Sequence, residues 1–140
     1  MEKVVSEFER DSVRHWARYW LPVAAYAAVI YYFSSLPHPE EKLPELLLKE
    51  VSDKFLHLIE YAVLAWLCYR GFRRAAGPVV ARHALILTIV AGSIYGMTDE
   101  VHQAFVPFRE PSWLDWMADT AGAAIGAVGA HRTARQETTA

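Results

Sequence analysis

The sequence predicts an all-α fold, a small multipass membrane bundle of four transmembrane helices. Three observations predict it. Apolar residues make up 54 % of the 140-residue chain, above the ~45–50 % that is usual in soluble domains. Charged residues gather at the chain ends and in short clusters, which leaves long stretches nearly free of charge. Aromatic residues flank the first of these stretches, as they do at membrane surfaces. The length fits one domain, residues 1–140.

The first uncharged stretch separates Arg18 from Glu40 by 21 residues without a formal charge. That is enough for a helix that crosses a ~30 Å hydrocarbon core. A cleavable signal peptide is a competing interpretation, but the apolar part is rich in aromatic residues and no small-x-small cleavage site follows it. A soluble four-helix bundle would need a polar face on every helix, and Tyr19–Leu36 has none. We predict the first span at about 17–36.

The other three stretches are shorter or are interrupted by polar residues. Each can cross a membrane if its polar side chains face the inside of a bundle rather than lipid. We predict these spans at about 54–70, 83–103 and 112–131. Between the first and second spans, Pro44 opens a leucine-rich segment, Leu43–Lys54, which we interpret as a short amphipathic helix on the outer surface.

The distribution of Lys and Arg predicts the orientation of these spans. If both termini are cytoplasmic, ten of these residues lie inside and four lie outside, which is the arrangement that the positive-inside rule favours. We therefore expect a multipass protein of the cytoplasmic membrane. A net charge of −2 argues against a nucleic-acid partner. The single cysteine, Cys68, excludes an intrachain disulfide and a cysteine-cluster metal site.

With this topology, polar residues from three separate stretches all lie toward the outer side. They come from the start of the second span, the end of the third and the start of the fourth. Charges at such depth cost several kcal/mol unless they are paired or hydrated, so they indicate function or tight pairing. The candidate catalytic residues are His57, Glu60, Asp99, Glu100 and Asp119. The candidate substrate-binding residues are Lys54, Tyr61, Gln103, Arg109 and Asp115.

Several of these residues also have a structural interpretation. Asp115 follows Ser112 by three residues and resembles the acid of a capping box. Lys54 is placed to extend toward the membrane surface, Arg109 could neutralise surplus acids, and His57 could be a hydrogen-bonded interior histidine. Glycines below the carboxylates predict close helix–helix contact rather than chemistry; they are Gly92, Gly96, Gly122, Gly126 and Gly129.

The same polar residues carry a family resemblance. They read Asp53-Lys54-Phe55-Leu56-His57-x-x-x-Tyr61, then Asp99-Glu100-x-x-Gln103-x-Phe105-x-Pro107-x-Arg109, then Asp115-x-x-x-Asp119-x-x-Gly122. In order and spacing, over about residues 52–126, this sequence resembles the VanZ-like family. That family is named for a protein associated with low-level resistance to the glycopeptide antibiotic teicoplanin. The resemblance implies a small multipass membrane protein of the bacterial cell envelope, without a settled biochemical activity.

Two positions depart from the family pattern. Phe108 stands where a glycine often precedes the arginine, and we expect it to stiffen the loop. Asp119 stands where many members have asparagine. The second change adds a negative charge and favours the binding of a metal ion or a proton.

Three functions stay open at this point. As an enzyme, the protein would use its acids and His57 on a membrane lipid or a lipid-linked cell-wall precursor, with Lys54 and Arg109 holding an anionic head group. A divalent Mg²⁺, Mn²⁺ or Ca²⁺ would suit the carboxylates, whereas a zinc site would use His57 and His102. We expect the site to be an outward-opening polar pocket, with His57, Asp99 and Asp119 at its base and Arg109 at its rim.

As a binding or transport module, the same residues would hold a lipid head group or a proton without any reaction. Four short spans are too few for an alternating-access transporter unless the protein forms a homo-oligomer. As a structural element, the polar network would only hold the bundle together.

Overall fold

The computed structural model describes residues 2–37 and 53–139, and within them the all-α prediction is confirmed. The described residues form five helices: α1 (Glu2–Ser34), α3 (Asp53–Ala75), α4 (Gly77–Arg82), α5 (Ala84–Gln103) and α6 (Trp113–Thr139). The amphipathic helix predicted at Leu43–Lys54 lies outside the described residues, apart from its last two residues, which belong to α3.

By length and composition, one described helix, α5, is long and apolar enough to cross a membrane on its own. The four predicted spans are therefore not shown, and they stay a prediction. The reason lies in the composition of the other long helices: α1 is rich in Tyr and Trp, and α3 and α6 carry charged residues among their apolar ones. Such helices are compatible with lipid only if a bundle covers their polar side chains.

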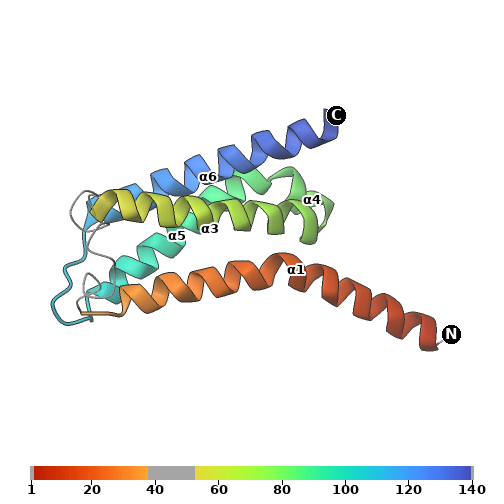
Figure 1. Cartoon of the computed structure of the whole chain (residues 1–140), viewed down its shortest axis with the longest axis horizontal. Coiled ribbons are helices and arrows are strands. Elements are labelled where there is room, and N and C mark those ends of the chain that lie inside the picture. Colours follow the sequence, from red (N-terminus) through yellow and green to blue (C-terminus); the bar gives the residue numbers. More distant parts are fainter. Residues whose placement is uncertain (1, 38–52, 140) are drawn as a thin grey trace.

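Helix α3 is the centre of the bundle. It packs against α6, α1 and α5, and α5 in turn packs against α6. Figure 1 shows α3 between α6 and α1, with both chain termini and α4 at one end of the bundle. Helix α1 bends part-way along its length (Figure 1), and it contains Pro22, which has no N–H to donate to the helix ladder.

The bundle has two chemically different ends. The polar end contains the start of α3, the last turn of α5, the connection 104–112 and the start of α6. The arginine end contains the last turns of α3, all of α4 and the part of α6 from His131 to Glu137. The ends lie about 24 Å apart along α3, since Arg73 follows His57 by sixteen positions and a helix rises about 1.5 Å per residue.

Glycines let the helices approach closely between these ends, as the sequence predicts. A Cβ atom on Gly122 would collide with the backbone carbonyl of Leu58, and one on Gly126 would collide with that of Ala62. On the other side of α6, a Cβ on Gly92 would lie 2.6 Å from the Cβ of Ala123. The glycine faces of α5 and α6 are therefore helix contacts.

Helix α4 is an element that the sequence pattern did not predict. It begins at Gly77, whose φ of 83° lies in the left-handed region that favours glycine. Pro78 lies in its first turn, where a missing N–H costs nothing. The chain thus turns from α3 into α5 over a short, ordered connection that carries Arg82 in its last turn.

Candidate functional site

At the polar end, three helices bring one side chain each to a common point. These are His57 of α3, Glu100 of α5 and Asp119 of α6, and one nitrogen or oxygen atom of each lies within 4.8 Å of the others. All three are buried, with relative exposures of 7 %, 6 % and 0 %. We call them the His57–Glu100–Asp119 cluster. Its residues come from three distant parts of the sequence.

The hydrogen bonds of this cluster leave two carboxylate oxygens unsatisfied. His57 Nδ1 lies 3.0 Å from Asp119 Oδ1, and Glu100 Oε2 accepts a 2.6 Å hydrogen bond from the backbone N–H of Ser112. The other oxygens, Asp119 Oδ2 and Glu100 Oε1, are buried without a hydrogen-bond partner in the described part of the chain. A buried acceptor without a donor is costly, and these two oxygens are free to accept a hydrogen bond or to coordinate a cation.

The backbone of α5 makes room for Asp119. A Cβ on Gly96 would lie 2.8 Å from Asp119 Oδ2 and 2.9 Å from its Cβ, closer than real Cβ contacts come. Because Gly96 has no side chain, the carboxyl group of Asp119 can lie directly against the neighbouring helix. The glycine thus positions one member of the cluster, in addition to packing the helices.

Two further pairs surround the cluster. Lys54 Nζ donates a 2.6 Å hydrogen bond to Asp115 Oδ1, with the side chain of Lys54 46 % exposed and that of Asp115 9 % exposed. Gln103 Nε2 donates to Asp99 Oδ2 at 3.1 Å, and both residues are buried. Tyr61 is fully buried beside Tyr95, with ring centroids 6.1 Å apart.

Three residues named from the sequence are placed differently from the expectation: Glu60, Arg109 and His102. Glu60 is half-buried and does not belong to the cluster. Arg109 is also half-buried, and its Nη2 donates to the Phe33 carbonyl at 3.4 Å. It therefore contacts the last turn of α1 instead of the acids, a position where a cation is favoured by the helix dipole.

His102 also faces α1. Its ring stacks on Tyr31 with centroids 4.6 Å apart, and its Nε2 lies 3.0 Å from Ser35 Oγ. The zinc alternative that joins His57 to His102 is therefore wrong, because only His57 reaches the cluster. The expectation of an open pocket is also corrected. His57, Asp99 and Asp119 are packed in the bundle with at most 7 % exposure, rather than lining an open cavity.

The structure changes the interpretation of Ser112 and Asp115. Sequence spacing predicts a capping box, in which the carboxylate of Asp115 would accept from the Ser112 N–H. In the structure Asp115 is paired with Lys54, and Glu100 of α5 accepts from that N–H instead. An acid from a neighbouring helix thus caps the start of α6, an arrangement that spacing within one segment cannot reveal.

The connection between α5 and α6 explains the departure at Phe108. This residue has a φ of 63°, in the left-handed region where side chains are rarely found. That is why glycine is the natural residue at this position, and Phe108 holds the same turn with a strained backbone. Its side chain is 83 % exposed, as is that of Phe105, and Trp113 is 69 % exposed.

Fold and site together define a small all-α bundle with a buried cluster of acids and one histidine at one end. The chain belongs to the VanZ/LLP1 family, because the sequence model of that family matches residues 7–133. The match confirms the resemblance and extends beyond the motif region at 52–126. Neither a curated protein nor a solved structure matches the chain. Family membership and the candidate span α5 together indicate a membrane location.

Proposed function

We propose that α1, α3, α5 and α6 cross the bacterial cytoplasmic membrane with both termini in the cytoplasm. Two observations support this topology. Both termini lie at the same end of the bundle, as an even number of spans requires (Figure 1). That end carries most of the arginines, as the positive-inside rule expects. The polar end then faces outward.

Single-cysteine labelling in intact cells tests the topology, in a Cys68→Ala background. Glu110→Cys lies on the exposed connection at the polar end, and Arg74→Cys lies at the arginine end. We expect an impermeant thiol reagent to label the first position and to spare the second until the cells are opened. Labelling of the Arg74 position in intact cells contradicts the topology.

We propose further that the polar end binds the anionic head group of a membrane lipid or a lipid-linked cell-wall precursor, through a divalent cation. The carrying observation is the pair of buried, unpartnered oxygens in the His57–Glu100–Asp119 cluster. Two carboxylates and one imidazole are a donor set that divalent ions such as Mg²⁺ or Mn²⁺ accept. A cation there would also offset the like charges of Glu100 and Asp119.

Charge near the cluster supports an anionic ligand. Lys54 belongs to the same end, and its partner Asp115 lies one helical turn before Asp119 on α6. An ammonium group and a bound cation would thus stand about one turn apart, which suits a phosphate group. Lys54 is half-exposed while the cluster is buried, so a head group would meet Lys54 first.

Exposed aromatic residues support a ligand that stays in the membrane. Phe105, Phe108 and Trp113 lie on or next to the connection 104–112 and point their apolar surface outward. Aromatic side chains in such numbers at one end of a bundle are typical of the membrane–water interface. A lipid could keep its chains in the bilayer while its head group reaches the polar end.

Lipid binding by the purified full-length protein tests this function. The protein is incubated with bacterial lipid extract in Mn²⁺ or in EDTA, and the retained and altered lipids are identified by mass spectrometry. We expect Mn²⁺ to add saturable retention of an anionic lipid. This added retention should be absent in EDTA and in Asp119→Asn, and present in the control Glu110→Gln. Retention that neither EDTA nor Asp119→Asn changes contradicts the proposal.

The same incubation separates an enzyme from a binding protein. A new lipid product that forms only in the presence of the cation assigns a reaction to the cluster, with His57 placed to act as acid or base. Saturable binding without product assigns a binding module. A role in teicoplanin tolerance, which the family resemblance suggests, has its own readout in the growth of cells with wild-type or Asp119→Asn protein in the antibiotic.

A further inference from the structure

The arginine end carries a groove of about 420 Å³ that the function proposed above does not use. Residues of α3, α4, α5 and α6 line it. Its polar side chains are Arg73, Arg82, Arg135 and His131, its apolar ones include Tyr69 and Leu85, and none of its described lining residues is acidic. We call it the arginine groove.

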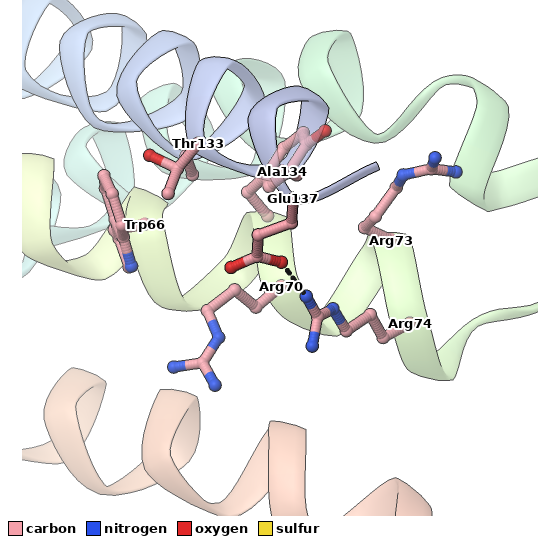
Figure 2. A pocket seen from close by; sticks show the side chains of 9 residues that line it. Trp66, Arg70, Arg73, Arg74, Thr133, Ala134 and Glu137 are labelled. Atoms are coloured by element: carbon pink, nitrogen blue, oxygen red, sulfur yellow. Dashed lines mark hydrogen bonds and ion pairs between the residues drawn. The ribbon is translucent and has the colours of Figure 1, made fainter. Parts of the chain in front are cut away.

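The neighbouring cavity shows what the arginine groove lacks. That cavity, of about 230 Å³, is lined by Arg70, Arg73 and Arg74 and also by Glu137. Arg74 Nη2 donates to Glu137 Oε2 at 2.7 Å. Figure 2 shows this pair, with Arg73 directed away from it. Neither Arg73 nor Arg82 forms an ion pair with a carboxylate in the described part of the chain, so their charge is available to a ligand.

Helix ends alone do not explain this arrangement. Arg73 and Arg82 lie in the last turns of α3 and α4, where the helix dipole favours cations. Arg135 does not lie in the last turn of α6, and yet it lines the same groove. The positive-inside rule accounts for arginines at this end of the bundle, but not for three of them around a single groove.

Two neighbouring features suit an anion at the groove. Leu85 lies in the first turn of α5, where backbone N–H groups have no intrahelical acceptor and the helix dipole is positive. The side chain of His83, the N-cap residue, makes no capping hydrogen bond there. His131 Nδ1 lies 2.9 Å from the hydroxyl of buried Tyr69, which fixes the imidazole at the groove wall.

Apolar surface beside the groove favours a lipid over a soluble ion. Val79 of α4 is 73 % exposed and Ile86 of α5 is 63 % exposed. These residues lie close in sequence to Arg82 and Leu85 of the groove. A ligand with both a phosphate and acyl chains can occupy the charged groove and the apolar surface together.

We propose that the arginine groove binds the phosphate group of an anionic phospholipid from the cytoplasmic leaflet. The proposal rests on the topology above but not on the cation cluster, which lies at the opposite end. Arginine matches a phosphate with paired N–H donors, and each basic residue near an anionic membrane surface strengthens attraction several-fold. A lipid held there would link α3, α4, α5 and α6 at one point.

Native mass spectrometry of the full-length protein in neutral detergent tests the groove. The ligands are phosphatidylglycerol, phosphatidylcholine and inorganic phosphate. We expect phosphatidylglycerol to bind about tenfold more tightly than phosphatidylcholine, or better, and the preference to survive EDTA. The double variant Arg73→Gln/Arg82→Gln should lose it. The control Arg18→Gln/Arg132→Gln removes the same charge from arginines outside both cavities and should keep it.

Three outcomes would each overturn the proposal. Equal binding of the two lipids shows that the groove does not recognise the anionic head group. An equal loss in the groove variant and in the control shows a general charge effect rather than a site. Displacement of the lipid by inorganic phosphate at similar concentration makes a soluble phosphate the ligand.

If the double variant does not fold, as judged by circular dichroism, Arg135→Gln replaces it with the same expected loss. Survival of the preference in EDTA separates this result from the cation-dependent binding at the polar end.

Discussion

The polar end and the arginine end use charge in opposite ways. At the polar end the carboxylates of Asp115 and Asp119 are buried, and their partners Lys54 and His57 lie on α3. At the arginine end the Arg74–Glu137 pair is exposed on both sides, at 44 % and 59 %. The comparison teaches that a charged ligand would change the folding free energy most at the end where the acids are buried. The number of ion pairs at an end does not indicate this.

Between the two ends, glycine and alanine residues form a line of close helix–helix contacts, which we call the seam. Gly122 and Gly126 lie against the backbone of α3, and Gly92 lies against Ala123. The position of the cluster depends on this seam, because His57 and Asp119 belong to the two helices that it joins. The arginine groove depends less on it, since its charged side chains are long and exposed.

The largest expected effect comes from breaking the seam. Gly126→Ala places a Cβ against the backbone carbonyl of Ala62, which cannot move without separating α3 from α6. We expect a loss of about 2–3 kcal/mol in folding free energy, the usual size of an overpacking effect. The matched control is Gly129→Ala, one turn along, whose Cβ would meet only the side chain of Trp66 at 3.2 Å. Thermal unfolding in detergent measures both, and equal losses would show that the seam is not close-packed.

A smaller effect, of opposite sign, tests the polar end. Glu100→Gln keeps an oxygen for the Ser112 N–H but removes a negative charge near Asp119. In EDTA we expect this variant to be more stable than the wild type by about 1–2 kcal/mol, because like charges at such distances repel by that order. In Mn²⁺ the wild type should gain stability and the variant should not.

The exposed Glu110→Gln serves as the control for this experiment. It removes the same charge at the same end and should leave the melting temperature unchanged in both solutions. A purely structural network predicts the reverse for Glu100→Gln, namely a lower melting temperature in EDTA and no response to Mn²⁺ in any variant.

The smallest effects come from the cation of one ion pair at each end. Lys54→Gln leaves Asp115 nearly buried without its cation, whereas Arg74→Gln leaves Glu137 exposed to water. We expect Lys54→Gln to cost about 1 kcal/mol and Arg74→Gln to cost about 0.5 kcal/mol or less. Thermal unfolding of both variants in the same detergent solution measures the difference between their losses of folding free energy. Equal costs would mean that the two ends do not differ in how they hold charge.

The sequence could predict the helices and the set of polar residues better than their partners. Charge-free stretches and helical spacing place His57, Asp99 and Asp119 at one end, and the glycine spacing predicts close helix contact. Spacing within a helix does not say which helix lies opposite. Glu100 therefore caps α6 in place of Asp115, and His102 and Arg109 face α1.

Local backbone conformation was the other feature that spacing could not supply. Phe108 has a left-handed backbone that its residue type does not suggest, and only the family pattern of glycine at that position hints at it. Helix α4 follows from Gly77 and Pro78, but six residues are too few for a periodic signal. The arginine groove needs four helices in contact, so no single stretch of the sequence shows it.

Mn²⁺ binding is the most direct test of the central claim, that the buried cluster holds a divalent cation. Purified wild-type protein is titrated with Mn²⁺ and the free ion is followed by electron paramagnetic resonance. We predict one saturable site per chain, absent in Asp119→Asn and in Glu100→Gln and retained in Glu110→Gln. No saturable site in the wild type, or the same site in Asp119→Asn, contradicts the claim and leaves the cluster as a structural network.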